Sequence, residues 1–139
     1  MIDIDNPVTQ RCIEGSRAEF EGRLEDAHRW YRQAWDMAQD DYEACIAAHY
    51  LARFQATPAD IFHWNREALR RAEAVDAGRV QAFLPSLYLS MGYACEQIGD
   101  MKEARHYYAL AAALGHTHQS ETTALARGKI GSPQSRAEQ

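Results

Sequence analysis

Apolar residues recur at spacings of three and four along most of the chain, and this period predicts amphipathic helices rather than strands. The helix expected from about residue 24 to 37 carries one apolar face, made of Leu24, Ala27, Tyr31 and Ala34. Asn6 and Pro7 signal the start of the helix before it, because asparagine caps free N–H groups and proline is tolerated in a first turn. Thr57–Pro58 and Pro85–Ser86 repeat this start signal. The pattern predicts an all-α protein.

The helical pattern of the first part of the chain is repeated near its other end. Six small, aromatic or turn-forming residues recur at one constant offset: Gly15, Gly22, Leu24, Ala27, Tyr31 and Ala34 correspond to Gly92, Gly99, Met101, Ala104, Tyr108 and Ala111. Each stretch should therefore form the same supersecondary unit, which buries its apolar face only against a neighbouring unit. We expect a stack of such units.

The second copy resembles the tetratricopeptide repeat, a helix-turn-helix unit of about 34 residues with an apolar–Gly pair and a later Ala-x-x-x-aromatic motif. The residues that carry the resemblance are Tyr88, Met91, Gly92, Cys95, Ala104 and Tyr108, with Cys95 replacing an aromatic residue. In the first copy, Arg11 and Glu14 stand where large apolar residues are typical. The resemblance covers roughly residues 7 to 118. It implies a right-handed superhelical stack of antiparallel helix pairs, with about seven helices in all.

The separation of the two copies, from Gly15 to Gly92, leaves room for a middle unit that is nine residues longer than the repeat. Helical spacing continues there without the motif. His49, or Ala48 if the register slips by one, falls at the position of the packing glycine, and Asn65 falls at the position of the aromatic residue. We place the extra residues after Ala68, as a longer second helix and a wider loop around residues 76–78.

We expect one domain over residues 1–130. Its units span about 8–41, 42–84 and 85–118, and a capping helix at about 119–130 would cover the open apolar face of the last unit. Residues 131–139 are polar and contain Pro133, which predicts a disordered tail.

The net charge of −5 and the sequence pI near 5.6 disfavour nucleic-acid binding, because such a field repels phosphate backbones. There is no apolar run long enough to span a bilayer, so we expect no membrane partner. The start of the chain carries no basic region followed by an apolar stretch, and a cytoplasmic location is expected. Abundant alanine with only two lysines is typical of bacterial genomes rich in G and C.

Candidate chemistry is sparse. The three cysteines, Cys12, Cys45 and Cys95, are too widely spaced for a disulfide framework or a zinc site and are expected to be reduced. A redox role stays open for Cys12 if it faces a groove. His116 and His118 offer two imidazoles in an expected loop, where a solvated loop is favoured over a metal site. Because no catalytic or phosphate-binding motif is present, we expect a non-enzymatic protein without cofactor or metal.

The resemblance implies that the first helices of the units line a concave groove. Spacing relative to the packing-glycine position selects nine inward residues: Cys12, Ser16, Glu19, Ile46, Tyr50, Arg53, Leu89, Tyr93 and Glu96. This mixed surface suits an extended peptide or a helix with an apolar face, although Tyr50 and Tyr93 could instead pack in the core. Tetratricopeptide domains that grip a C-terminal carboxylate place a lysine and an asparagine at positions held here by Cys12 and Ser16, so that use is disfavoured.

Two tryptophans suggest an alternative. Tyr31 takes the core position of its helix, so Trp30 and Trp35 cannot both share its face. An exposed tryptophan would favour a self-associating homo-oligomer, whereas packing on a neighbouring repeat is the other possibility.

Overall fold

The computed structural model of the chain describes residues 5–130, together with the side chains of residues 5–76 and 78–115. Within these residues the protein has seven α-helices, one short 3-10 helix and no strand. The helices are α1 (Pro7–Phe20), α2 (Leu24–Met37), α3 (Asp41–Leu51), η1 (Ala52–Phe54), α4 (Pro58–Glu73), α5 (Ala77–Val80), α6 (Leu84–Gln97) and α7 (Met101–Ile130). The all-α prediction is confirmed. No described helix is long and apolar enough to cross a membrane.

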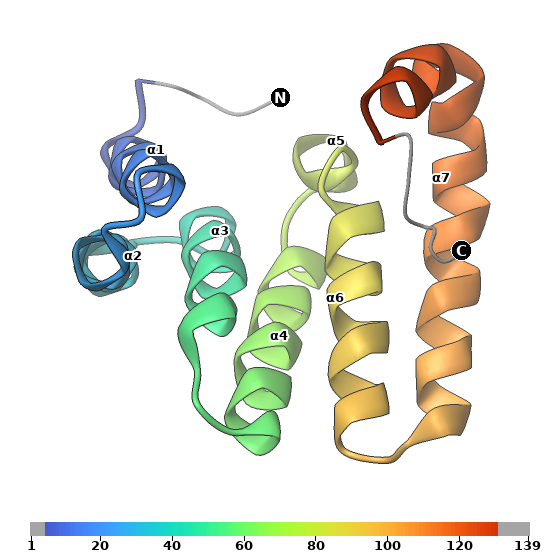
Figure 1. Ribbon diagram of the computed structural model, residues 1–139, viewed down its shortest axis with the longest axis horizontal. Helices are drawn as coiled ribbons and strands as arrows, with labels where there is room; N and C mark the ends of the chain where they lie inside the picture. Colours follow the sequence, from blue (N-terminus) through green and yellow to red (C-terminus); the bar gives the residue numbers. More distant parts are fainter. Residues whose placement is uncertain (1–4, 131–139) are drawn as a thin grey trace.

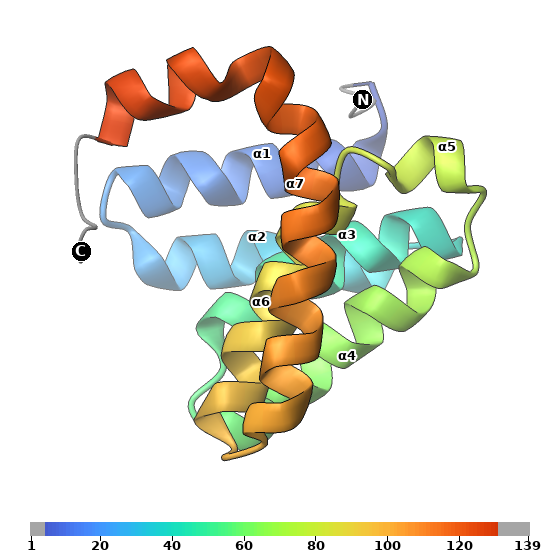
Figure 2. The ribbon, with the colours of Figure 1, turned by 90° about the vertical axis from the view of Figure 1, so that its right-hand side faces the viewer.

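Successive helices pack as pairs: α1 with α2, α3 with α4, and α6 with α7. The pairs are joined by contacts of α3 with α1 and α2, and of α4 with α6, so that α4 lies between α3 and α6 (Figure 1). The pair α1–α2 is viewed along its axes in Figure 1 and from the side in Figure 2, where it runs crosswise to α6 and α7. The pairs therefore change direction along the chain.

The helix boundaries themselves repeat. The segments 7–20, 41–54 and 84–97 each form the first half of a unit, and the middle one consists of α3 continued by η1. The second helices begin at Leu24, Pro58 and Met101, and the spacings between these starts equal the spacings between the starts of the first halves. The extra residues of the middle unit lie after Ala68, in a longer α4 and in the segment that contains α5. The wide loop expected around residues 76–78 is therefore replaced in part by a short helix.

A tyrosine from each outer second helix packs directly on a glycine of the preceding helix. The ring of Tyr31 lies on Gly15, and that of Tyr108 lies on Gly92. The turns that follow α1 and α6 contain Gly22 and Gly99, whose φ angles of 80° and 87° are strained for residues with a side chain. Small buried residues share the Tyr31 face of α2, namely Ala27 and Ala34. Leu24 begins that face but is exposed.

The expected helix starts are present. Asn6 Oδ1 accepts hydrogen bonds from the N–H groups of Val8 and Thr9, at 2.8 and 3.1 Å. Thr57 Oγ1 accepts one from the N–H of Asp60 at 3.1 Å, and Pro58 occupies the first turn of α4. The side-chain caps at these two starts confirm the prediction made from the cap-then-proline signal.

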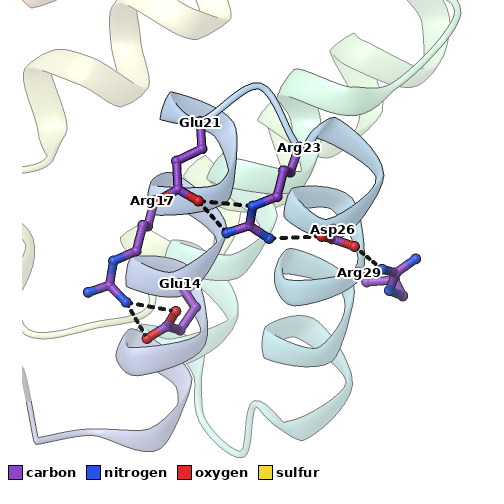
Figure 3. A network of polar contacts seen from close by, with 6 residues as sticks. All are labelled: Glu14, Arg17, Glu21, Arg23, Asp26 and Arg29. Carbon is purple, nitrogen blue, oxygen red and sulfur yellow. Dashed lines mark hydrogen bonds and ion pairs between the residues drawn. The ribbon is translucent and has the colours of Figure 1, made fainter.

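Charged side chains surround the α1–α2 turn (Figure 3). Arg23 donates hydrogen bonds to both Glu21 and Asp26, at 2.6 and 2.8 Å, and so bridges the end of α1 and the start of α2. Further ion pairs in this network join Arg17 to Glu14 and Arg29 to Asp26. Because these pairs are largely exposed, solvent and salt screen them, and each adds little to the stability of the fold.

The C-terminal expectation needs correction. Helix α7 runs without a break over Met101–Ile130, so there is no separate capping helix at 119–130 and no loop at His116 and His118. Its ribbon instead changes direction in the C-terminal part (Figure 2). Gly115 lowers helix propensity by about 1 kcal/mol, which does not end a helix without a proline or a cap beside it. The expected tail at 131–139 lies outside the described residues.

Candidate functional site

A pocket of about 420 Å³ opens between the middle unit and α6. Its walls come from α3 with η1, from α4 and from α6, and the lining residues are His49, Ala52, Arg53, Ile61, Asn65, Leu89, Ser90 and Tyr93. Three of these, Arg53, Leu89 and Tyr93, are among the residues that the sequence placed in the groove. The pocket therefore brings together expected groove residues from the middle unit and from α6.

The pocket lies where the middle unit lacks its Gly–Tyr pair. Residues of the first and middle units that are separated by one constant offset are buried alike. These buried pairs are Val8 and Tyr42, Cys12 and Ile46, and Ala18 and Ala52. His49 rather than Ala48 thus corresponds to Gly15, and Asn65 corresponds to Tyr31. Asn65 is short, and its Nδ2 donates to the carbonyl of Ile61 at 2.9 Å. No tyrosine ring from α4 therefore packs on α3 as Tyr31 packs on Gly15.

His49 forms a polar part of the pocket wall. Burial, and next the positive charge of Arg53, lower the pKa of its imidazole, so the ring is neutral at pH 7. Its Nδ1 atom is buried and has no hydrogen-bond partner among the described residues. A neutral ring of this kind tolerates an apolar neighbour better than an imidazolium would.

Helix α6 supplies an exposed apolar rim. Leu89 and Tyr93 lie one helical turn apart on α6 and are 52% and 54% exposed. Large apolar side chains left open beside a pocket are typical of surfaces that bind a partner. Tyr93 is therefore open to solvent at the edge of the pocket and is not a core residue.

Glutamates at the ends of α1 and α6 are held by the repeat tyrosines. Tyr31 Oη donates to Glu19 Oε1 at 2.8 Å, and Tyr108 Oη donates to Glu96 Oε1 at 2.6 Å. Arg53 Nη2 also donates to Glu19, through Oε2 at 2.6 Å, which ties η1 to α1. Burial is the main cause of the raised pKa values of Tyr31 and Tyr108, and their glutamate partners raise them further.

Tyr50 and Ser16 lie at the edge of this surface. Tyr50 is half-buried and stacks on Tyr31, with ring centroids 4.9 Å apart. Ser16 is also half-buried, and its Oγ lies 3.2 Å from the hydroxyl oxygen of Tyr31. Tyr50 therefore packs partly in the core, whereas Tyr93 is exposed at the edge of the pocket.

Two of the expected groove residues lie in the core instead. Cys12 and Ile46 are each only 3% exposed, because α1 packs closely on α3 and Tyr50 lies near the Cys12 thiol. Burial raises the pKa of the Cys12 thiol to about 12, which disfavours the thiolate that redox chemistry needs. The structure thus argues against a redox role for Cys12 and against its place in the groove.

The tryptophans pack on neighbours. Trp35 meets Trp64 of α4 edge to face at 4.9 Å, and Trp30 is partly buried beneath the Arg11 guanidinium at 5.9 Å. Phe20, by contrast, is 93% exposed, which sequence reasoning missed. Its only signal was a position just before the α1–α2 turn, outside the apolar spacing of α1.

Comparison of the chain with models of known protein families, with curated proteins and with solved structures found no match. Among the described residues, no group of three or more histidine, cysteine, aspartate or glutamate side chains could hold a metal ion. Functional inference therefore depends on the pocket and its rim.

Proposed function

We propose that the chain is a tetratricopeptide-like interaction module whose helix pairs form a right-handed superhelical stack and whose groove binds a segment of another protein. The repeated helix boundaries and the two Gly–Tyr contacts support this architecture. The bound segment is an extended peptide or a helix with an apolar face.

The pocket beside Leu89 and Tyr93 is the observation that carries this proposal. Seven of the nine expected groove residues are half-buried or exposed: Ser16, Glu19, Tyr50, Arg53, Leu89, Tyr93 and Glu96. A partner side chain in the pocket would contact Ile61 and Ala52 as well as the two rim residues, and such buried contacts are typical of binding hot spots.

Binding fits this pocket better than catalysis. The imidazole that lines it, His49, has a lowered pKa, and its Nδ1 makes no hydrogen bond that would orient it as a base. The same pocket holds Ser90, but no described contact joins its hydroxyl to His49 as activation of a nucleophile would require. We therefore propose a non-enzymatic role.

The test is selection of peptides from a random display library, followed by calorimetric titration of the selected peptides. Leu89→Ala and Tyr93→Ala should each weaken binding at least about fivefold, because truncating a hot spot costs more than about 1 kcal/mol. Leu24→Ala is a matched control, since Leu24 is 56% exposed on another helix. Peptides that bind both rim variants as tightly as the native protein would sink the proposal.

Self-association is a second candidate, favoured by a specific observation. Phe20 and Leu24 leave an exposed apolar patch on either side of the α1–α2 turn, at 93% and 56% exposure. The partly buried tryptophans are not needed for it. Sedimentation equilibrium that shows a strict monomer at high concentration would exclude this candidate, whereas a dimer lost in Phe20→Ser would support it.

A bacterial cytoplasmic location and a protein partner complete the proposal. The three free cysteines are buried and unpaired with one another, as is usual in reducing compartments. The net charge of −5 supports a protein rather than a nucleic-acid partner.

A further inference from the structure

Glu19 and Glu96 occupy corresponding positions, and the surroundings of Glu19 show which group completes such a site. Both carboxylate oxygens of Glu19 have donors: the Tyr31 hydroxyl at Oε1, 2.8 Å away, and the Arg53 guanidinium at Oε2, 2.6 Å away. The arginine comes from the unit that follows along the chain.

Glu96 has the tyrosine of this arrangement without the arginine. Tyr108 Oη donates to Glu96 Oε1 at 2.6 Å. Among the described side chains, none donates a hydrogen bond to Glu96 Oε2 and none forms an ion pair with the Glu96 carboxylate. Ile130 follows Glu96 at the same spacing at which Arg53 follows Glu19, so the chain has no arginine at the corresponding position. The α6–α7 turn, close to Glu96, lies at the opposite end of the molecule from the C-terminal part of α7 in both Figure 1 and Figure 2.

The neighbours of Glu96 also suit a guanidinium group. Tyr93 lies one turn before it on the same helix, is 54% exposed, and is close enough to Tyr108 to contribute to that residue's raised pKa. A guanidinium bound at Oε2 would thus meet a carboxylate and the open aromatic ring of Tyr93 together, and both attract it. The pocket begins at the same Tyr93.

We propose that Glu96 binds an arginine of the partner segment, with the guanidinium held between Glu96 and Tyr93 while an apolar side chain of the same segment fills the pocket. This inference rests on the proposed peptide-binding function and specifies its partner. Lysine fits less well, because its ammonium group is a more strongly hydrated point charge without the planar fork of arginine.

A double-mutant cycle tests the pairing. Selected peptides should contain an arginine next to the apolar anchor, and replacing it by citrulline, which is uncharged, should weaken binding to the native protein about fivefold. Glu96→Gln should weaken binding of the arginine peptide by a similar factor without affecting the citrulline peptide. Glu25→Gln is the control, because it removes the same charge from an exposed position on α2 and should change nothing.

A partner-independent probe keeps this inference separable from the proposed function. Titration with N-acetyl-arginine amide should shift the backbone amide resonances of Tyr93 and Glu96 saturably, whereas N-acetyl-citrulline amide and the Glu96→Gln variant should give no such response. An equal response to both compounds, or none to either, would overturn the arginine site and leave peptide binding intact. Peptides that bind independently of Leu89 and Tyr93 would overturn the proposed function, whatever Glu96 does.

Discussion

The ring of Tyr31 lies so close to the backbone of Gly15 that a Cβ atom at position 15 would be 2.3 Å from Tyr31 Cε1. The same contact recurs at Gly92, where a Cβ would be 2.5 Å from Tyr108 Cε1. Tyr31 is fully buried and cannot swing away. These two contacts set the distance between the helices of the outer pairs.

Alanine at either glycine should therefore destabilise the fold. Gly15→Ala is expected to lower the free energy of unfolding by about 1–3 kcal/mol, the usual range for overpacking, and Gly92→Ala should act in the same direction. Gly115→Ala is the matched control, because Gly115 is helical with open space beside it and should gain up to about 1 kcal/mol from helix propensity. Urea denaturation measures the free energy of unfolding of all three variants. Equal values for Gly15→Ala and Gly115→Ala would contradict the close contact between Gly15 and Tyr31.

The buried thiols should make the protein sensitive to alkali. Burial raises the pKa values of Cys12 and Cys45 from 9.0 to about 12. Because the folded state holds these protons more tightly than the unfolded chain, the free energy of unfolding should fall as the pH rises from about 9 toward 12. Urea denaturation at a series of pH values should show that the free energy of unfolding of a Cys12→Ala/Cys45→Ala variant falls less steeply with rising pH than that of the native protein. An equally steep fall in the variant would contradict the burial of the two thiols.

His49 should have the opposite effect on the acid side. Its pKa is lowered from 6.5, so the folded state binds a proton less readily than the unfolded chain. The stability it contributes is complete above about pH 6.5 and is lost as the pH falls through the lowered pKa. His49→Gln should flatten the stability profile below pH 6.5, and urea denaturation at a series of pH values measures this. A variant whose stability falls with acid as steeply as that of the native protein would contradict the neutral state of the half-buried His49.

Restoring the missing Gly–Tyr pair should close the pocket. Asn65→Tyr alone should be destabilising because His49 occupies the space that the ring needs. His49→Gly combined with Asn65→Tyr should recover stability relative to Asn65→Tyr and abolish peptide binding without loss of helical circular dichroism. Retained peptide binding in a folded double variant would show that the pocket is not the anchor site.

The sequence anticipated much of the fold because glycine and tyrosine mark close helix contacts directly. Gly15 with Tyr31, and Gly92 with Tyr108, recur at one offset, and the structure places each pair in contact. The continuity of α7 past Gly115 was not predictable from propensity, since a single glycine favours a helix end without enforcing one.

Groove positions were predicted less well because spacing does not say which helix covers a residue. Cys12 and Ile46 share a register position with Leu89, yet only Leu89 is exposed. Helix α1 packs directly on α3, whereas α6 packs mainly on α4 and α7, which leaves Leu89 uncovered. Leu89 is therefore free to line the pocket that the missing Gly–Tyr pair of the middle unit leaves open.

Site-specific cross-linking most directly tests whether this groove binds a peptide. Selected peptides should cross-link to the protein when p-benzoylphenylalanine replaces Tyr93, unlabelled peptide should compete, and the same replacement at Leu24 should give no adduct. Adducts at position 24 equal to those at position 93, or covalent dimers of the protein in place of peptide adducts, would contradict peptide binding at the α6 rim.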